Sequence, residues 1–169
     1  MLRCYFGGFM EIKIIEVEKP EDLNIIVGQA HFIKTVEDVY EALITSYPDI
    51  KFGFAFCESS GKRLIRHSGT DNELEKLAIK NARNIAAGHT FVLLLGNAYP
   101  INIMKSLKSI DEVLFLYAAT ANPLKIAVLE EKEQRGIIGV LDGKIPLGVE
   151  KEEDIKERRD FLRKIGYKK

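Results

Sequence analysis

The stretch that most constrains the fold runs from residue 68 to residue 96 and reads "SGTDNELEKLAIKNARNIAAGHTFVLLLG". Its first part predicts an amphipathic helix, because apolar residues recur at helical spacing and acidic residues occupy the first turn. Thr70 or Asp71 is expected to cap this helix, and Gly88 is expected to end it. The apolar run that follows His89 predicts a buried strand. A helix that leads directly into a buried strand indicates a sheet covered by helices.

The rest of the chain repeats this alternation of helix and strand patterns. A helix is predicted from Thr35, its expected cap, to Tyr47, and a β-hairpin is predicted over residues 51–67. The remaining predictions are strands near 11–17, 23–28, 111–120, 124–131 and 136–142, and helices near 100–109 and 151–165. The fold class is therefore α/β: a single compact domain with a mixed β-sheet, partly parallel through its strand–helix–strand units, covered by helices.

We expect this domain to span residues 10–169. Residues 1–9 match none of the later patterns and are predicted to be an N-terminal extension outside the fold. The charged helix at about 151–165 is predicted to lie on the surface, seated by its apolar side chains. These side chains are Ile155, Phe161, Leu162 and Ile165.

The composition suits one globular domain, since 46% of the 169 residues are hydrophobic and 30% are charged. The formal net charge is zero, so neither nucleic acid nor an anionic membrane is predicted as a partner. No apolar run is long enough to cross a bilayer, and the first residues lack a signal-peptide pattern, which indicates a cytoplasmic location. Abundant Lys, Glu and Ile without Trp are compatible with a thermophilic source. Cys4 and Cys57 form neither a metal-binding spacing nor a disulfide framework, and Cys57 is expected to be buried.

The common phosphate-binding and hydrolytic motifs are missing from the sequence. It contains no Walker A motif, no GxGxxG, no HExxH, no CxxC and no GxSxG. A conventional ATP-dependent kinase or a dinucleotide enzyme would therefore lack its usual phosphate cradle.

Polar residues instead gather at predicted strand ends, where loops and helix N-termini commonly bind ligands. In "GQAHFIKT", Gln29 can hydrogen-bond a base or ribose, while His31 and Lys34 can face an anion beside a helix start. Each also has an ordinary structural reading: a satisfied histidine, a solvated lysine, and Thr35 as a helix cap.

Three further stretches have the same character. They contribute Asn97, Tyr99 and Asn102 in "GNAYPIN", Thr120 and Asn122 in "ATANP", and Asp142 in "GVLDGK". Amide groups, an aromatic face and a carboxylate suit a nucleoside, and a carboxylate can also hold a ribose diol or a proton. The alternative is that Asn and Asp beside Pro or Gly simply form turns.

His89 is predicted at the amino end of its own strand, on the edge of the sheet. If His31 and His89 share a pocket, their strands must run antiparallel, or the pocket must form between subunits. The third histidine, His67, follows a hairpin arm and is expected to be exposed.

Five blocks together resemble the adenosine-specific kinase family: "NIIVGQAHFIKTVEDVYEAL", "NARNIAAGHTFVLLL", "AYPINIMKSLK", "ATANPLKIAVLE" and "RGIIGVLDG". The similarity runs from about Met10 to Asp142, and the first nine residues and the charged tail lie outside it. The resemblance implies a compact α/β protein that forms a homo-oligomer, with a trimer favoured. It also implies binding of adenosine and AMP in preference to ADP or ATP, and a histidine that carries phosphate.

Carried over by motif, the catalytic candidates are His31, His89 and Lys34. Either histidine could be the one that is phosphorylated. The candidate nucleoside or phosphate contacts are Gln29, Asn97, Tyr99, Asn102, Thr120, Asn122 and Asp142. Mg²⁺ is a reasonable expectation for phosphoryl transfer, although no ligand cluster in the sequence demands it. A neutral imidazole is a competent nucleophile for phosphorus near neutral pH.

These features predict a protein that binds adenosine or AMP and transfers a phosphoryl group through a phosphorylatable histidine. Whether it turns over as a kinase stays open. One alternative is a non-catalytic adenosine or AMP sensor, in which the histidines only hydrogen-bond the ligand. A second alternative is a structural or interaction subunit with no small ligand.

Overall fold

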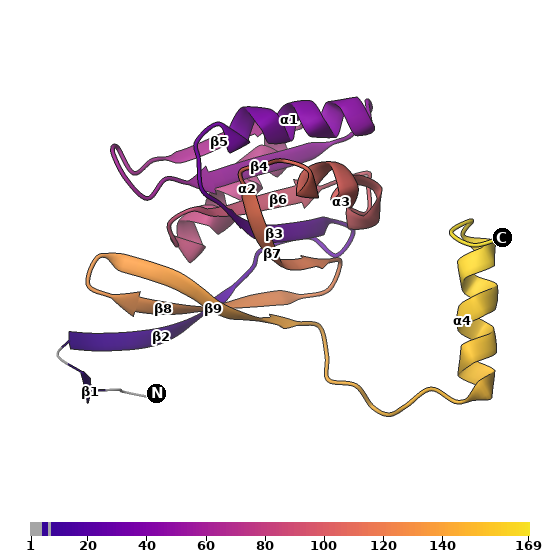
Figure 1. Ribbon diagram of the computed structural model, residues 1–169. Coiled ribbons are helices and arrows are strands. Elements are labelled where there is room, and N and C mark those ends of the chain that lie inside the picture. The colour runs from indigo at the N-terminus through magenta and orange to yellow at the C-terminus, as the bar shows by residue number, and fades with distance from the viewer. Residues whose placement is uncertain (1–4, 7) are drawn as a thin grey trace.

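The computed structural model describes residues 5, 6 and 8–169 of the chain (Figure 1). Within this part, nine strands and four helices follow one another along the sequence. The strands are β1 (Tyr5–Phe6), β2 (Gly8–Glu16), β3 (Asn24–Ala30), β4 (Phe52–Cys57), β5 (Ile65–Gly69), β6 (Thr90–Leu95), β7 (Val113–Thr120), β8 (Leu124–Glu131) and β9 (Gln134–Asp142). The helices are α1 (Thr35–Ser46), α2 (Asn72–Ile85), α3 (Pro100–Lys108) and α4 (Glu152–Lys164). None of the described helices is long and apolar enough to cross a membrane.

The strands form two sheets, one of five strands in the order β5-β4-β6-β3-β7 and one of four in the order β1-β2-β8-β9. In the larger sheet, every residue of β4 and β6 is buried. Successive side chains of a strand point to opposite faces, so Phe52, Phe54 and Phe56 share one face of β4. The predicted hairpin of β4 and β5 is confirmed by their antiparallel pairing.

Helices α1 and α3 cover the face that carries these phenylalanines. Val39 and Leu43 of α1 and Ile103 and Leu107 of α3 are buried in one apolar cluster with the phenylalanines of β4. The packing of α1 in this layer holds the helix in place. It therefore also holds the short loop between β3 and α1, which carries His31 and Lys34.

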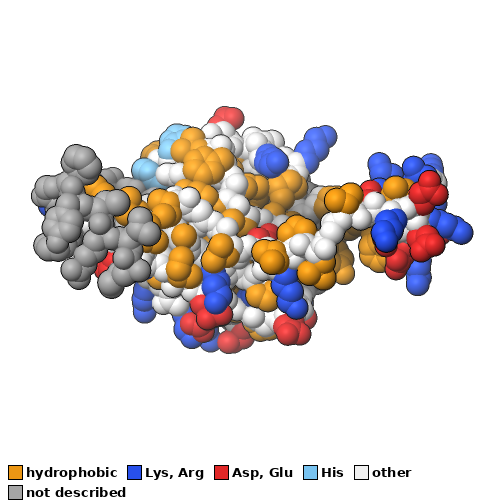
Figure 2. All heavy atoms as spheres, turned by 90° about the horizontal axis from the view of Figure 1, so that it is seen from below, with side chains coloured by type: hydrophobic (Ala, Val, Ile, Leu, Met, Phe, Trp, Pro, Cys, Tyr) orange, Lys and Arg blue, Asp and Glu red, His pale blue; other side chains and the backbone are white. Residues whose placement is uncertain are grey.

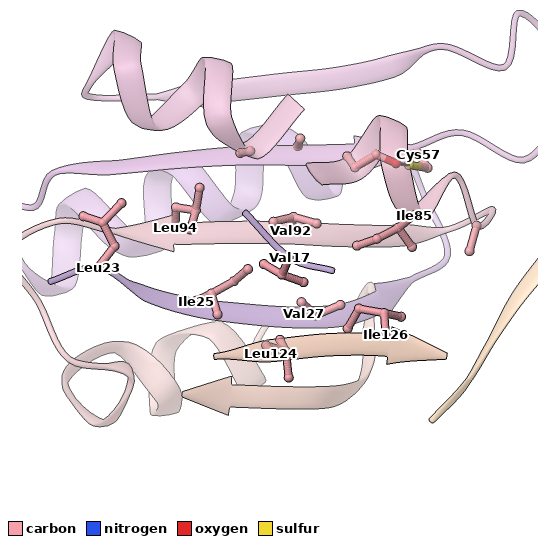
Figure 3. Packing of buried hydrophobic residues seen from close by; sticks show 14 of the residues in the cluster. Val17, Leu23, Ile25, Val27, Cys57, Ile85, Val92, Leu94, Leu124 and Ile126 are labelled. Carbon is pink, nitrogen blue, oxygen red and sulfur yellow. Dashed lines mark hydrogen bonds between the residues drawn. The ribbon is translucent and has the colours of Figure 1, made fainter. Parts of the chain in front are cut away.

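Helix α2 and the four-stranded sheet cover the opposite face of the larger sheet. The inner face of β8 contributes Leu124, Ile126 and Val128 to a second buried cluster, which also contains Ile85 of α2. The outer face of the four-stranded sheet is not covered by any described element, and Figure 2 views the molecule from this side. Figure 3 shows side chains from β3, β6, β8 and the end of α2 pointing toward one another in this cluster.

The mixed sheet predicted from the sequence is wrong, because every strand pairing among the described residues is antiparallel. β3 and β4, which α1 connects, do run in the same direction. They are not neighbours, because β6 lies between them and pairs antiparallel with both. The α/β class itself, with helices packed on sheets, is confirmed.

The predicted cap of α2 is confirmed at its N-terminus but not at its C-terminus. Asp71 caps the helix as expected, accepting hydrogen bonds from the amides of Glu73 (3.0 Å) and Leu74 (3.2 Å). At the other end the left-handed residue is Ala86, with φ 48°, and not Gly88. The expected cap of α1 also differs: Thr35 is its first helical residue, and its buried hydroxyl donates to the carbonyl of Phe32.

The two ends of the chain differ from the body. Tyr5 and Phe6 pair with the start of β2. Residues 1–4 and 7 lie outside the described residues, so the prediction that residues 1–9 form an extension outside the fold stays a prediction for them. Helix α4 falls within the range predicted for the charged helix, but none of its residues is buried. Figure 1 shows it set apart from the sheets at the end of a long connecting segment. Of the side chains expected to seat it, Phe161 and Ile165 border a hollow with Tyr99, but both stay exposed.

Candidate functional site

A cleft of about 930 Å³ opens between one end of the five-stranded sheet and the β8–β9 hairpin. It is bordered by the ends of β3 and β4, the loop 58–64, the last turn of α2 and the turn before β6. Its polar lining includes Gln29 and His89, the cations Lys62, Arg63, Arg83 and Arg135, and the carboxylates Glu58, Glu131 and Glu133. We call it the His89 cleft. Its volume lies in the range of small-molecule sites in proteins.

His89 sits in a strained backbone conformation at the mouth of this cleft. Its φ is +61°, a left-handed value that non-glycine residues rarely adopt and that clusters at functional sites. Two hydrogen bonds hold it there: its amide donates to Cys57 O (2.8 Å), and its carbonyl accepts from Ala30 N (3.0 Å). The half-buried imidazole stacks on Phe56, with ring centroids 6.1 Å apart and planes 14° apart. No side-chain hydrogen bond engages the imidazole within the described residues, so a ligand can reach its nitrogens.

Gln29 lines the same cleft from the end of β3. Its side-chain oxygen accepts a hydrogen bond from the hydroxyl of Tyr117 (3.2 Å), which leaves its amide NH₂ for a ligand. The pairing of β3 with β7 shifts register on both sides of the Gly28–Gln29 pair, and such bulges often re-aim side chains beside active sites. Gly28 itself makes room for Phe91, whose ring would lie 2.4 Å from an added Cβ. The glycine therefore serves core packing rather than close approach of a ligand.

Four cationic side chains border the cleft, and two of them are engaged within the chain. Arg135 donates to the last carbonyls of α2 and pairs with Glu130, and Arg63 pairs with Glu133 at 3.3 Å. Lys62 and Arg83 have no ion-pair or hydrogen-bond partner in the part of the chain that the structure describes. Lys62 lies close enough to Glu58 for its charge to help lower the pKa of that carboxyl, but neither cation is held in an ion pair within that part of the chain. Two exposed cations that are free of such contacts, beside an imidazole, form a favourable place for an anionic group.

The loop that carries Lys62 is held in place by Glu58. This carboxylate accepts from the amide of Leu64 (2.8 Å) and from Nε of Arg66 (2.9 Å). The amide hydrogen bond, assisted by Arg66, lowers the pKa of Glu58 below its usual value. Gly88 lets the loop approach His89, because an added Cβ would lie only 2.5 Å from Oγ of Ser59.

Sequence reasoning missed Lys62, Arg83 and Glu58 as residues of this site. The motif "ESSGKR" is an ordinary hairpin connection by local rules, and Arg83 is an ordinary basic residue in the last turn of a helix. Only the β4–β6 pairing, which places the hairpin loop beside His89, makes them neighbours.

His31 lies at the same end of the sheet as His89. β3 and β6 run antiparallel, with Gln29 opposite Thr90, so the geometric condition for a shared pocket is met. His31 is nevertheless exposed, its amide donates to Glu112 O (3.1 Å), and it is not among the residues that line the cleft.

Lys34 is bound by two carboxylates. Its ammonium contacts Asp38 and lies 2.7 Å from Oε1 of the buried Glu112. The hydrogen bond to Asp38, followed by that to Glu112, raises the pKa of Lys34 well above its usual range. Because two carboxylates already neutralise its charge, the Lys34 ammonium attracts an external phosphate less strongly.

Asn97 and Asn102 lie at the opposite end of β6 from His89 and make local hydrogen bonds. The side chain of Asn97 accepts from Lys51 N (2.7 Å) and donates to Asp49 O (2.8 Å). Asn102 accepts from the amide of Tyr99 (2.9 Å) at the start of α3. The exposed ring of Tyr99 borders a different, apolar hollow that Phe161 of α4 also lines.

Thr120, Asn122 and Asp142 are brought together, but with one another. The Thr120 hydroxyl donates to Asp142 (2.8 Å), the Asn122 side chain donates to the same oxygen (3.1 Å), and the Asn122 amide donates to Thr120 (3.0 Å). Thr120 pairs with Ile25 near the start of β3, while Gln29 lies near its end. A strand of this length spans about 20 Å, so the predicted residues divide between two ends of the sheet.

Two further chemical possibilities have little support in the described residues. No group of three or more His, Cys, Asp or Glu side chains gathers there in a way that could hold a metal ion. Cys57 is buried, as expected, and its burial raises the pKa of the thiol to about 11, which disfavours the reactive thiolate.

Comparisons with known proteins identify the family and a similar solved structure. The model of the family described as "Adenosine specific kinase" matches residues 15–168. This match extends through the charged tail, beyond the blocks that carry the resemblance in sequence. The chain is also similar to the crystal structure of the PH1918 protein from Pyrococcus horikoshii OT3, with 46% identity and a TM-score of 0.90. That similarity covers 95% of this chain and 99% of the other. None of the curated proteins matches the sequence.

Proposed function

The chain belongs to the adenosine-specific kinase family, and from this premise we propose that it binds adenosine and AMP in the His89 cleft and transfers a phosphoryl group through His89. The observation that carries the proposal is the grouping of His89 and Gln29 with Lys62 and Arg83, two cations without an ion-pair partner among the described residues, around one cleft. An imidazole supplies the nucleophile, and the two cations supply the charge that a phosphoryl group requires.

The transfer has two balanced steps. First, a neutral imidazole nitrogen attacks the phosphorus of a phosphoanhydride donor; the N–P bond forms, the bridging P–O bond breaks, and the leaving phosphate keeps that electron pair. Second, the 5′-hydroxyl oxygen of adenosine attacks the same phosphorus. The N–P bond then breaks, its electron pair returns to the imidazole, and the hydroxyl proton passes to solvent. Lys62 and Arg83 stabilise the charge on the phosphoryl oxygens in both steps.

We assign the phosphorylated residue to His89 and not to His31 because of the surroundings of each side chain. The backbone of His89 is held between β3 and β4, and its ring is braced on Phe56 inside the cleft. His31 is exposed, and the neighbouring Lys34 is engaged by Glu112 and Asp38. A positioned nucleophile gains more from preorganisation than a freely rotating one.

A second candidate function is a sensor that binds adenosine or AMP without turnover. One observation favours it: no described side chain hydrogen-bonds the His89 imidazole, whereas catalytic histidines are commonly oriented by a partner. In that case the imidazole only donates or accepts a hydrogen bond to the ligand.

The test combines intact mass with ligand titration on untreated protein. The proposal expects an added phosphate that is lost in acid, absent from His89→Ala and retained in His31→Ala. It also expects stabilisation by adenosine and AMP, since a ligand that binds only the folded state raises the melting temperature. ADP that binds as tightly as AMP would refute the expected selectivity. If adenosine binds but is not phosphorylated with any phosphoanhydride donor, the kinase activity is refuted and the sensor function is supported. No stabilisation at millimolar adenosine would favour an interaction subunit.

The assembly and the cellular setting are proposed from the family resemblance and the composition. We propose a homo-oligomer, with a trimer favoured, in the cytoplasm of a thermophile. Any Mg²⁺ would be held mainly by the substrate phosphates, as this ion usually is in phosphoryl transfer.

A further inference from the structure

Two apolar surfaces of this chain lack a covering element, and we propose that they pack against each other between copies. The first is the C-terminal arm, residues 144–169. The second is the open sheet face, the outer side of the four-stranded sheet with Ile12, Ile14 and Leu141. The arm of one copy lies on the open sheet face of a second copy.

The arm exposes apolar side chains to an extent that a solvated linker does not need. Ile145, Leu147 and Val149 are 84%, 102% and 90% exposed, and they occupy alternate positions. In an extended chain, alternate side chains point to the same side. Helix α4, which follows, has no buried residue although it carries Phe161. An apolar stripe of this kind on a soluble chain usually marks an interaction site.

The open sheet face also exposes apolar side chains. Val128, which points inward, is fully buried, whereas Ile12, Ile14 and Leu141 are 45%, 54% and 56% exposed on the outer side. No atom lies within 4 Å of a Cβ added at Gly139, so this face is also open above the backbone. Figure 2 shows hydrophobic side chains spread over the middle of this side of the molecule, with charged side chains mostly toward its margins.

The arm does not cover the open sheet face of its own copy, and it is long enough to reach a neighbouring copy. The arm leaves the end of β9 and runs away from the open sheet face in Figure 1, and only the end of α4 comes near the body, beside Tyr99. The eight residues 144–151 can span about 26 Å when extended, and the 13 residues of α4 add about 20 Å. An arm-to-face contact is head-to-tail, and such contacts close into rings when the rotation fits. The inference therefore deepens the homo-oligomer proposed above and does not depend on nucleotide binding.

The position of this interface bears on the His89 cleft. Ile138 of β9 is 53% exposed and lines the cleft. A copy seated on the open sheet face would therefore lie close to Ile138, at the edge of the cleft.

The first experiment is sedimentation equilibrium of the full chain and two arm variants. The wild-type chain is expected at an integer multiple, above one, of its 19.1 kDa mass. The double variant Leu147→Asp with Val149→Asp places two carboxylates on the packed side and is expected to sediment as a monomer. Gly148→Asp is the matched control, because its side chain points to the other side and an added Cβ meets no atom within 4 Å. It is expected to stay assembled.

Three outcomes would overturn the inference: a monomeric wild type, an assembled double variant, or equal dissociation of both variants. Far-UV circular dichroism checks that each variant is folded, and the substituted side chains are too exposed for the body of the protein to depend on them. A monomer that still binds adenosine would refute this interface alone, whereas an assembled protein that binds no adenosine would refute the nucleotide proposal alone.

A second experiment identifies the surface that receives the arm. Copies with Leu147→Cys are mixed with differently tagged copies carrying Ile14→Cys, in a Cys4→Ser background in which the buried Cys57 remains. After dissociation, reassociation and mild oxidation, the expected product is a disulfide between the two differently tagged chains. Failure to form it in an assembled mixture would overturn the arm-to-face contact.

Discussion

The amide nitrogen of Ala30 donates a 3.0 Å hydrogen bond to the carbonyl oxygen of His89. The bond lies just beyond the last β3–β6 residue pair, Gln29 with Thr90, and prolongs that ladder into the turn before β6. Together with the bond from the His89 amide to Cys57 O, it holds His89 in its left-handed conformation. The backbone of three strands therefore positions the imidazole.

Replacing His89 by glycine or by alanine should separate backbone strain from chemistry. Both variants should lose the acid-labile phosphate. His89→Gly should be the more stable by about 1 kcal/mol, because a left-handed conformation costs a residue with a Cβ about that much more than glycine. Intact mass and urea unfolding measure the two effects, with His31→Ala as control. Phosphate retained in both variants would contradict the assignment of His89.

Lys62 and Arg83 should act on the phosphate and not on the nucleoside. Lys62→Ala and Arg83→Ala should each weaken AMP binding about tenfold or more, since hydrogen bonds to charged groups contribute about 1.5–3 kcal/mol. Adenosine affinity should change little. Isothermal titration of both ligands gives the comparison, and Lys108→Ala on α3 is the matched control for an exposed lysine. An equal loss for adenosine and AMP would indicate a structural effect instead.

The ion pair of Glu112 with Lys34 should make stability depend on pH. The hydrogen bond from Lys34 lowers the pKa of Glu112 in the folded state. The contribution of Glu112 is therefore fully present above its unfolded pKa, about 4.3, and is lost as pH falls through the lower folded pKa. Lys34, whose pKa is raised, loses its contribution only as pH rises above its unfolded value of about 10.4.

Glu112→Gln should thus be less stable than the wild type at pH 7, and the difference should narrow as pH falls below about 4. Urea unfolding across this range measures it. Glu133→Gln, at a carboxylate that is 85% exposed, should show almost no effect at either pH. A Glu112→Gln deficit that is constant with pH would show that lost packing, not lost charge, is responsible.

Gly53→Ala should destabilise the fold through the contact between α2 and β4. An added Cβ would lie 2.1 Å from the carbonyl carbon of Leu74 and 2.2 Å from the amide of Glu75. Because these are backbone atoms, the whole helix must move, at a cost of about 1–3 kcal/mol or more. Thermal unfolding measures the loss, and Gly139→Ala, where an added Cβ meets no atom within 4 Å, is the control. Equal stability of the two variants would contradict the close approach.

Local patterns in the sequence were enough to predict most elements of secondary structure. Asp71 caps α2 because its carboxylate needs only amides two and three residues away. The hairpin of β4 and β5 follows from two β-patterned segments around a short polar loop. Gly88 shows the limit of such rules: it looked like a helix terminator, but it makes room for Ser59, 29 positions earlier in the chain.

The candidate site could be predicted only in part for the same reason. Gln29 and His89 were identified because each follows or precedes an apolar strand, and the structure places both on one cleft. Asn97 and Asp142 carried a similar local signal and lie at the other end of the sheet. Lys62 and Arg83 carried no signal, because a cation is distinctive only when the fold leaves it without an ion-pair partner beside a cleft.

The sequence by itself determined most of the segments that become helices and strands and most of the side chains that form the core, because periodicity and capping act over a few residues. The tertiary structure alone decided the order of the strands, with β6 between β3 and β4, and hence the antiparallel sheets. That order depends on which apolar faces cover one another across tens of residues, which no local pattern encodes. It also decided that His89 meets Lys62 and Arg83, and that Lys34 is bound by Glu112, since charge compensation is a property of position in space.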